Sequence, residues 1–245
     1  MKCLILAAGY ATRLYPLTEN FPKPLLKVKD KAILDYLIED IDSLKIVDEF
    51  VVISNSKFYK IFKDWADKKE QNVIVLDDGT SSNETRLGAV KDIEFAIDKL
   101  SINDEILVIA GDNLLDFSLT KFIKYAKEKD ATSIMRYYEP STEKLKKCGV
   151  ATVDETDKVI KLVEKPENPE SHYACPPFYY YPARDVKLVK KGIEEGCKTD
   201  APGSFIAWLS TKTTVYAMEM PGSRYDIGNL ESYEKVQKEY KGYVR

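Results

Sequence analysis

The sequence is poor in the side chains that most often bind metals or act as general bases. It has one histidine, His172, and four cysteines, none of which belongs to a Cys-x-x-Cys pair. Structural zinc sites need closely spaced cysteine or histidine ligands, so no such site is expected. Widely separated cysteines predict inert thiols in a reducing compartment, and we expect a structural role for His172.

An excess of charge and a long apolar run are also lacking. Lys and Arg total 37 against 40 Asp and Glu, a net charge of −3, which argues against a general nucleic-acid or anionic-membrane surface. No stretch approaches the ~20 apolar residues of a membrane span. The apolar run before Gly9 is shorter than that of a signal peptide. We therefore expect a cytoplasmic protein without nucleic-acid or membrane partners.

The first half of the chain alternates short apolar segments with segments of helical period. Strands are predicted at 3–6, 50–53, 73–76 and 106–110. Apolar residues recur at helical spacing within 33–44, 58–65, 90–97 and 119–123. Fully apolar strands that alternate with helices are typical of a parallel sheet covered on both faces.

The second half has a different pattern. Apolar segments 150–153 and 159–163 flank a polar turn and predict a β-hairpin. Further strands are predicted at 178–181 and 215–218, and helices near 183–195, 203–210 and 229–241. No Gly/Ser-rich linker and no internal repeat separates the halves, so we expect one domain over 1–245 that changes character near residue 130.

Small residues followed by cations come after the first strand. Ligands of open α/β sheets bind beyond the carboxyl ends of the strands. The segment Leu6-Ala7-Ala8-Gly9 would let backbone N–H groups approach phosphate oxygens, and Arg13 and Lys23 would supply charge. The segment is neither a Walker A loop nor a three-glycine dinucleotide fingerprint. These residues alone also fit a strand-ending turn with two surface cations.

Three other polar clusters are candidates for a site. Asp112, after the fourth strand, could hold Mg²⁺ or cap a helix. Asp226 could cap the helix expected to begin near Leu230. Glu164-Lys165-Pro166 closes a strand and could be an exposed charge pair.

A polar loop at 77–88 follows the third strand. Ser82 or Asn83 in this loop could cap the next helix.

Three ordered strings resemble the signature of the sugar-nucleotidyltransferase family, of the nucleoside-diphosphate-sugar pyrophosphorylase type. They are Leu6-Ala7-Ala8-Gly9, then Thr12-Arg13-Leu14-x-Pro16-Leu17-Thr18, then Pro22-Lys23-Pro24-Leu25-Leu26. The family includes glucose-1-phosphate thymidylyltransferases and CTP:phosphocholine cytidylyltransferases, and the resemblance runs from residue 2 to about 240. Many members have glycine where this chain has Ala11, and alanine should disfavour a positive φ there.

The resemblance implies a fold and a set of site residues. The fold is α/β, Rossmann-like and glycosyltransferase-A-like, with a mixed, mostly parallel central sheet flanked by helices. A nucleotide-binding half would span about 1–130 and an acceptor-binding half about 131–245. Arg13 and Lys23 would be catalytic. Mg²⁺ would be held by Asp112 and Asp226. The nucleotide would contact Leu6, Ala7, Ala8, Gly9, Thr12, Asp78, Gly79, Thr80 and Ser81. The acceptor would contact Asn113, Gly149, Glu164 and Lys165.

The implied reaction transfers NMP from a nucleoside triphosphate to a sugar 1-phosphate or similar phosphate monoester and releases pyrophosphate. The acceptor phosphate is ionised at pH 7 and needs no general base, so positioning and charge neutralisation would drive catalysis. The expected partners are these two substrates, and homo-oligomerisation is a tendency of the family.

Three alternatives remain open at this point. The first is a CTP-dependent cytidylyltransferase for phosphocholine or another phosphorylated amine, because the chain ends at Arg245 without the β-helix extension of larger members. Tyr179 to Tyr181 and Asp200 would be candidates to line its pocket. The second is a non-catalytic regulatory subunit, which the presence of all five charged site residues disfavours. The third is a glycosyltransferase, which the Pro-Lys-Pro-Leu-Leu string disfavours.

Overall fold

The computed structural model describes residues 1–243 and forms two compact units. The first unit comprises Met1–Arg86, Ala110–Thr120 and the chain from Pro221 onward, and the second comprises Leu87–Ile109 and Lys121–Met220. Each unit is therefore built from separate stretches of the sequence. The expectation of one domain that divides near residue 130 stays a prediction.

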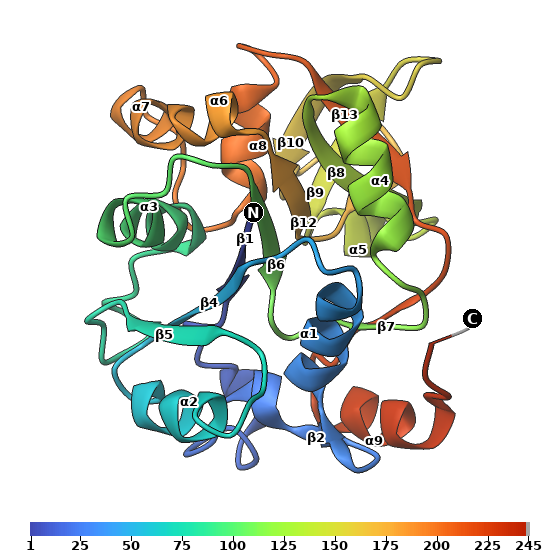
Figure 1. Cartoon of the computed structure of the whole chain (residues 1–245). Helices are drawn as coiled ribbons and strands as arrows, with labels where there is room; N and C mark the ends of the chain where they lie inside the picture. Colours follow the sequence, from blue (N-terminus) through green and yellow to red (C-terminus); the bar gives the residue numbers. More distant parts are fainter. Residues whose placement is uncertain (244–245) are drawn as a thin grey trace. The chain divides into compact units, whose positions relative to one another are not determined.

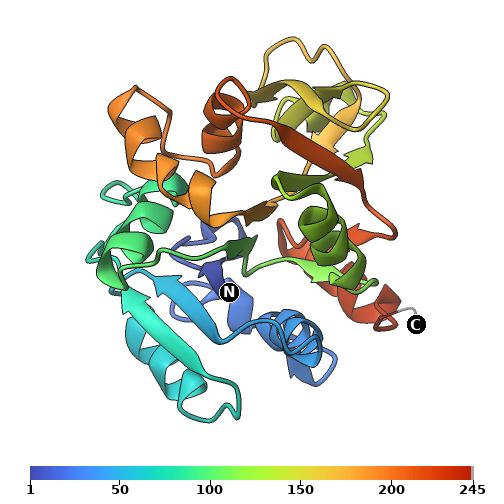
Figure 2. The same ribbon diagram turned by 45° about the horizontal axis from the view of Figure 1, so that its top comes forward.

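Parallel strands form the centre of the first unit (Figures 1 and 2). They are β1 (Lys2–Leu6), β4 (Glu49–Ser54) and β5 (Val73–Asp77). Leu4 pairs with Val51, and Val51 in turn pairs with Ile74. Helix α1 (Ile33–Ser43) precedes β4 in the chain, and α2 (Tyr59–Ala66) connects β4 to β5. The strands' central residues are buried, as expected for a sheet covered on both faces.

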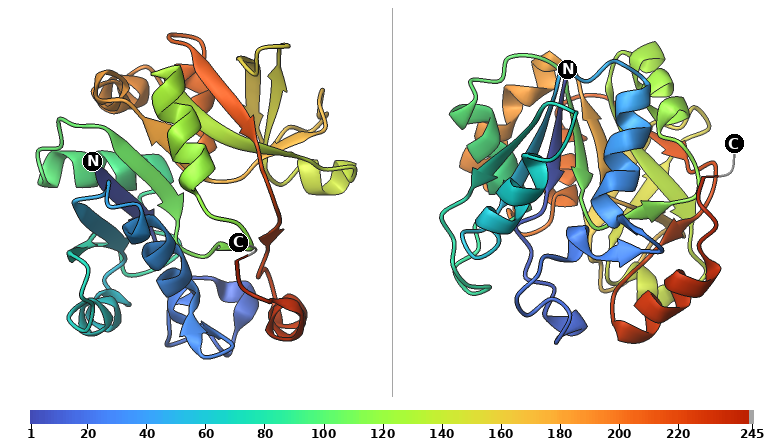
Figure 3. Two further views of the ribbon diagram at one scale, coloured as in Figure 1. Left: turned by 45° about the vertical axis from the view of Figure 1, so that its right-hand side comes forward. Right: turned by 60° about the horizontal axis from the view of Figure 1, so that its bottom comes forward.

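Short elements close the first unit around the segment that follows β1. They are η1 (Thr12–Leu14), η2 (Lys23–Leu25), the pair β2 (Lys27–Val28) and β3 (Lys31–Ala32), the pair β7 (Leu114–Leu115) and β14 (Arg224–Tyr225), and α9 (Leu230–Glu239). Helix α9 lies beside the segment that holds β2 and β3 (Figure 3). The side chains of Tyr233 and Gln237 on α9 donate to the backbone oxygen of Lys27, and Tyr240 Oη donates to that of Leu115 at 2.9 Å. Three distant parts of the sequence thus meet in this unit.

The second unit holds a mixed sheet. Its strands are β6 (Ile106–Ala110, whose last residue belongs to the first unit), β8 (Thr132–Tyr138), β9 (Gly149–Val153), β10 (Val159–Glu164), β11 (Tyr173–Cys175), β12 (Phe178–Tyr181) and β13 (Val215–Glu219). β13 pairs with β8 in parallel, and the other pairs within the unit are antiparallel. Its helices are α3 (Ala89–Lys99), α4 (Thr120–Lys129), α5 (Thr142–Leu145), α6 (Ala183–Val186), α7 (Leu188–Glu194) and α8 (Gly203–Leu209).

The predicted α/β class, a mixed central sheet flanked by helices, is confirmed. All eight predicted strands form, and 150–153 and 159–163 pair as the expected hairpin. β8 was not predicted because it carries polar residues, yet Thr132 and Ser133 are fully buried. Thr132 Oγ1 satisfies its burial by donating to Asp185 Oδ2 at 2.6 Å.

Two helix predictions were wrong. The segment 183–195 is two helices, because α6 ends at Val186 and α7 begins at Leu188. Neither Ser82 nor Asn83 caps a helix: the N-cap of α3 is Gly88, with φ 93° and no side-chain hydrogen bond. The backbone N–H of Ser82 instead donates a hydrogen bond to Thr85 Oγ1 at 3.3 Å.

The structure can also be compared with what the composition predicted for membrane spans, thiols and His172. Within residues 1–243, no helix is long and apolar enough to cross a bilayer. Burial raises the pKa of the Cys3 and Cys175 thiols well above the ordinary value, which makes them poor nucleophiles. The ring of His172 contacts the backbone oxygen of Glu139 at 3.0 Å through Nδ1, which fits a structural role.

Candidate active site

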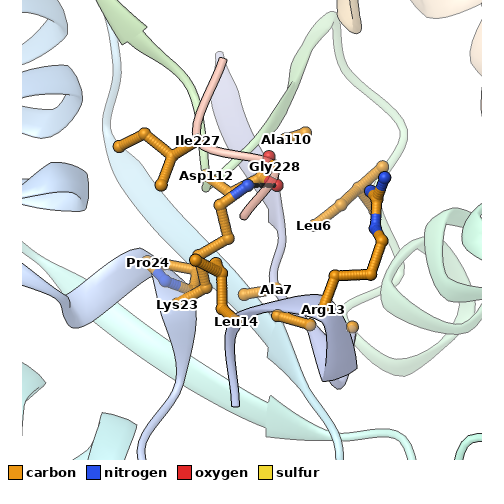
Figure 4. A pocket seen from close by; sticks show the side chains of 12 residues that line it. Leu6, Ala7, Arg13, Leu14, Lys23, Pro24, Ala110, Asp112, Ile227 and Gly228 are labelled. Carbon is orange, nitrogen blue, oxygen red and sulfur yellow. Dashed lines mark hydrogen bonds and ion pairs between the residues drawn. The ribbon is translucent and has the colours of Figure 1, made fainter. Parts of the chain in front are cut away.

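A pocket in the first unit gathers residues from four stretches of sequence (Figure 4). The residues that line it are Leu6, Ala7, Gly9, Ala11, Arg13, Leu14, Lys23, Pro24, Ala110, Asp112, Ile227 and Gly228. Small residues form the floor, and a β-carbon built on Gly9 would meet no atom within 4 Å. The backbone at Gly9 is therefore open to a ligand, and phosphate binding by this segment stays a prediction.

Ala11 adopts the positive φ that we expected alanine to disfavour. Its φ and ψ are 46° and 41°, in the left-handed region. The backbone oxygen of Ala11 accepts hydrogen bonds from Leu14 N at 3.0 Å and from Thr18 Oγ1 at 2.8 Å, and Thr18 is fully buried. These two bonds offset the ~1–2 kcal/mol that an L-residue incurs there, so the turn forms without glycine.

The two predicted catalytic cations differ in their surroundings. Arg13 lies on η1 and is exposed beside the pocket. Lys23 lies on η2 and is only 8% exposed, and its Nζ donates to Asp112 Oδ2 at 2.7 Å. Figure 4 shows the Lys23 side chain reaching across the pocket to Asp112, while Arg13 extends away from that pair. Lys23 is thus paired with the Asp112 carboxylate, whereas Arg13 is exposed to solvent.

Asp112 is not a helix cap, because the helix that follows it begins only at Thr120. Its side chain is 42% exposed despite the contact with Lys23. Burial would raise the pKa of Asp112, but the ammonium of Lys23 and then the guanidinium of Arg224 hold it below the ordinary value. The carboxylate is therefore ionised at neutral pH, as a cation ligand requires.

Asp226 is not a helix cap either. The N-cap of α9 is Asn229, which forms a capping box with Ser232. The Asp226 side chain is 70% exposed, and its neighbour Ile227 is fully buried and anchors the segment. Asp226 thus lies in the same unit as Asp112 with its oxygens open to solvent.

The donor chemistry of Asp112 and Asp226 fits a hard divalent cation. Such ions prefer carboxylate oxygens and keep several waters or phosphate oxygens in an octahedral shell. Among residues 1–243, no group of three or more His, Cys, Asp or Glu side chains could hold a metal. Two carboxylates would therefore bind a cation chiefly together with ligand oxygens.

The loop that carries the expected nucleotide contacts Asp78 to Ser81 lies outside the residues that line this pocket. Asp78 is buried, and its Oδ1 accepts from both the backbone N–H and the hydroxyl of Thr80 at 2.7 Å. Burial raises the pKa of Asp78, and the hydrogen bonds from Thr80 partly offset this. Gly79, at φ 79°, and the exposed Ser81 complete the turn. Asp78 and Thr80 thus stabilise the turn itself.

The acceptor candidates Gly149, Glu164 and Lys165 lie together in the second unit. Glu164 ends β10 and pairs in register with Gly149 on β9. A β-carbon on Gly149 would lie 3.1 Å from Glu164 Oε2, and one on Gly203 would lie 2.2 Å from it. Two glycines, of which the sequence indicated only Gly149, therefore make room for this carboxylate.

Lys165 has a positive φ of 51°, and its backbone N–H donates to Cys148 O at 3.0 Å. Its Nζ lies 3.4 Å from Asp200 Oδ2, and both side chains are about half exposed. An exposed pair of this kind contributes little to stability, so the ammonium remains available to an anionic ligand.

Asn113 and Arg224 form a pair in the first unit. Asn113 is buried, its Nδ2 donates to Ala110 O at 2.9 Å, and its Oδ1 accepts from Arg224 Nη1 at 3.1 Å. Both the nitrogen and the oxygen of the Asn113 amide, which was predicted to contact the acceptor substrate, thus form hydrogen bonds within the first unit. Arg224 was not singled out from the sequence, because only the fold brings it to Asn113, 111 positions away.

The aromatic run of β12 is strand core. Tyr179, Tyr180 and Tyr181 are at most 3% exposed, and the Tyr180 hydroxyl donates to Glu105. These three residues therefore provide no exposed aromatic wall for a cationic amine.

Glu164→Gln should stabilise the protein increasingly as pH rises. Burial raises the pKa of the Glu164 carboxyl. The positive charge of Lys165 partly offsets this rise, and the negative charge of Asp200 adds to it. A carboxyl whose folded-state pKa is raised contributes stability below its unfolded-state pKa and loses it as pH rises through the folded-state value. We expect equal unfolding free energies of variant and wild type near pH 4. By pH 8 the variant should be the more stable of the two. Urea unfolding at both pH values measures this, and a difference independent of pH would contradict it.

Comparison with known proteins gives a consistent result. A family model described as nucleotidyl transferase matches residues 2–242. The bifunctional protein GlmU of Methanocaldococcus jannaschii is 32% identical over all of this chain and 57% of its own length. The UTP–glucose-1-phosphate uridylyltransferase AglF of Haloferax volcanii is 24% identical over 97% of this chain and 95% of its own length.

The fold has close counterparts among solved structures. The crystal structure of a UDP-glucose pyrophosphorylase in complex with UDP-glucose has a TM-score of 0.80 and 19% identity, covering 96% of each chain. At that identity the likeness shows the fold. The chain spans about three-fifths of the length of relatives such as the M. jannaschii protein.

Proposed function

Since the chain belongs to the nucleotidyl transferase family, we propose that it transfers a nucleoside monophosphate from a nucleoside triphosphate to a sugar 1-phosphate and releases pyrophosphate. The observation that carries this proposal is the pocket beyond β1, which combines an open small-residue backbone with Arg13, Lys23 and Asp112. Relatives named for the uridylylation or adenylylation of glucose 1-phosphate support a sugar 1-phosphate as acceptor.

In this proposal the first unit binds the triphosphate. Backbone N–H groups from Leu6 to Gly9, with Thr12, contact phosphate oxygens, and the exposed Arg13 neutralises the charge that develops on the leaving pyrophosphate. Lys23 supplies its ammonium between the triphosphate and the acceptor phosphate. Asp78 to Ser81 remain the candidate residues for the base.

Nucleotidyl transferases generally depend on a divalent metal ion, and for this chain we propose Mg²⁺. Asp112 and Asp226 would hold it, since both carboxylates belong to the first unit and retain exposed oxygens. When bound, the ion neutralises phosphate charge. The protein's own contribution is to keep Asp112 ionised and Asp226 fixed by the buried Ile227.

In the second unit, Glu164 and Lys165 would bind the acceptor, with Lys165 orienting its phosphate. The acceptor oxygen then attacks the α-phosphorus in line, the bond from α-phosphorus to the bridging oxygen breaks, and pyrophosphate leaves with that oxygen. No general base is needed, because the acceptor phosphate is already ionised at neutral pH.

A pyrophosphate-release assay tests the proposal directly. CTP, UTP, dTTP, GTP and ATP would be crossed with glucose 1-phosphate, mannose 1-phosphate and phosphocholine in the presence of Mg²⁺. We expect pyrophosphate release that requires both substrates and one preferred pair containing a sugar 1-phosphate. A preference for phosphocholine would show that the acceptor is a phosphorylated amine and not a sugar 1-phosphate. Release of nucleoside diphosphate from a nucleotide sugar would indicate a glycosyltransferase. Absence of triphosphate binding would overturn the catalytic proposal in favour of a regulatory subunit.

A further inference from the structure

Each carboxylate of the candidate metal site already has a cation of the chain beside it. Lys23 Nζ lies 2.7 Å from Asp112 Oδ2. Arg224 Nη1 lies 3.9 Å from Asp226 Oδ1 and donates to Asn113 Oδ1 at 3.1 Å. Two negative charges are thus balanced by two positive ones within the first unit.

The contact between Lys23 and Asp112 is not a loose surface pair. The Lys23 side chain is 10% exposed, and its backbone is fixed on η2 between the buried residues Pro22 and Pro24. The Lys23 ammonium donates its hydrogen bond to Asp112 Oδ2. A buried ammonium without a counter-ion is strongly unfavourable, so Lys23 holds on to this carboxylate.

Arg224 is similarly constrained. Its side chain is 22% exposed, and its backbone belongs to β14, which pairs with β7. The hydrogen bond to the buried Asn113 fixes the guanidinium on the side of Asp226. Arg224 therefore remains beside Asp226 even though the Asp226 side chain is 70% exposed.

A divalent cation alone would gain little at such a site. A cation that took Asp112 Oδ2 would displace Lys23 and leave that ammonium buried without a partner, and a cation at Oδ1 would be repelled by the nearby ammonium. A triphosphate changes the balance, because its several negative charges offer Lys23 and Arg224 new partners and add oxygen ligands for the cation. The charges of these four side chains therefore couple metal binding to nucleotide binding.

We propose that Lys23 and Arg224 keep a divalent cation off Asp112 and Asp226 until a triphosphate is bound. The proposal rests on the proposed function and goes beyond it by making the metal site conditional. It also assigns Arg224 as a positioning residue that acts through Asp226.

Binding of Mn²⁺ to the nucleotide-free protein tests the proposal without measuring activity. Free Mn²⁺ would be quantified by electron paramagnetic resonance for wild type, Lys23→Met and Arg224→Gln. We expect Lys23→Met to bind Mn²⁺ at least ~10-fold more tightly than wild type, and Arg224→Gln at least ~3-fold more tightly, as expected when a neighbouring positive charge is removed. Two variants at different elements guard against a folding defect in either one.

Matched controls separate the local effect from net charge. Lys60→Met changes an exposed lysine on α2 of the same unit and should bind Mn²⁺ as wild type does. Asp112→Asn combined with Lys23→Met should abolish the gained affinity, which locates it. Tight Mn²⁺ binding by nucleotide-free wild type, or no gain in either variant, would overturn the proposal.

The nucleotide arm distinguishes this proposal from the proposed function. Water-proton relaxation of Mn²⁺ would be followed as each of the five triphosphates is added to wild type. We expect a ternary complex with at least one of them. Failure with all five would count against the proposed function. The nucleotide-free comparison would still decide whether Lys23 and Arg224 exclude the cation.

Discussion

Asp112→Asn should lower turnover by ~10²-fold or more, the effect typical of removing one electrostatic stabiliser from an active site, while leaving the fold intact. Asn retains an oxygen that can accept the hydrogen bond from Lys23, which Asp112 accepts at 2.7 Å. The loss is therefore one of charge rather than of shape. The measurement is the rate of pyrophosphate release at saturating substrates, together with urea unfolding to verify the fold.

Asp98→Asn is the matched control for this variant. Asp98 is an exposed residue of α3, and removing its charge should leave turnover unchanged. If Asp112→Asn retained wild-type turnover, Asp112 would not act in the reaction. If it lost turnover together with its unfolding transition, the effect would be structural.

Local patterns sufficed to predict most of the strands and the segment that lines the pocket. Val51, Val52 and Ile53 form a continuous apolar run that only a fully buried strand explains, and they are fully buried in β4. The small residues Ala7, Ala8 and Gly9 follow β1 directly. In both cases the signal and the structure it specifies lie within a few residues of each other.

Contacts between distant parts of the sequence could not be predicted in this way. The bond between Lys23 and Asp112 joins positions 89 apart, and no periodicity records it. The same holds for Arg224 and Asn113. β8 was missed for a related reason, since its buried Thr132 is compatible with a core only because Asp185 accepts its hydroxyl hydrogen bond.

Side-chain direction was the other limit. The sequence favoured strand core for Tyr179 to Tyr181, but an aromatic run carries no period that separates the two faces of a strand, so a ligand contact stayed open. The structure buries all three side chains, and β12 is an interior strand that pairs with β6 and β8. The amine-binding alternative thereby loses these three candidate aromatic contacts.

Gly88→Ala should destabilise the protein by about 3 kcal/mol or more, because backbone strain and a steric clash combine there. Gly88 has φ 93°, and a β-carbon would lie 2.5 Å from Thr199 O and 2.9 Å from Thr199 C. These are backbone atoms held in place, since Val90 N donates to Thr199 O at 3.0 Å and Ala89 N donates to Asp200 O at 3.2 Å. The clash cannot be relieved by rotating a side chain. Urea unfolding of variant and wild type measures the loss.

Gly196→Ala isolates the clash from the backbone strain. Gly196 has nearly the same φ, 89°, but a β-carbon there would meet no atom within 4 Å. Its substitution should therefore cost only the ~1–2 kcal/mol of a left-handed L-residue. A similar loss in both variants would show that the backbone around Thr199 yields to the added methyl group. A clearly larger loss at Gly88 than at Gly196 would establish that the close approach of α3's first turn to the segment before α8 requires the absence of a side chain.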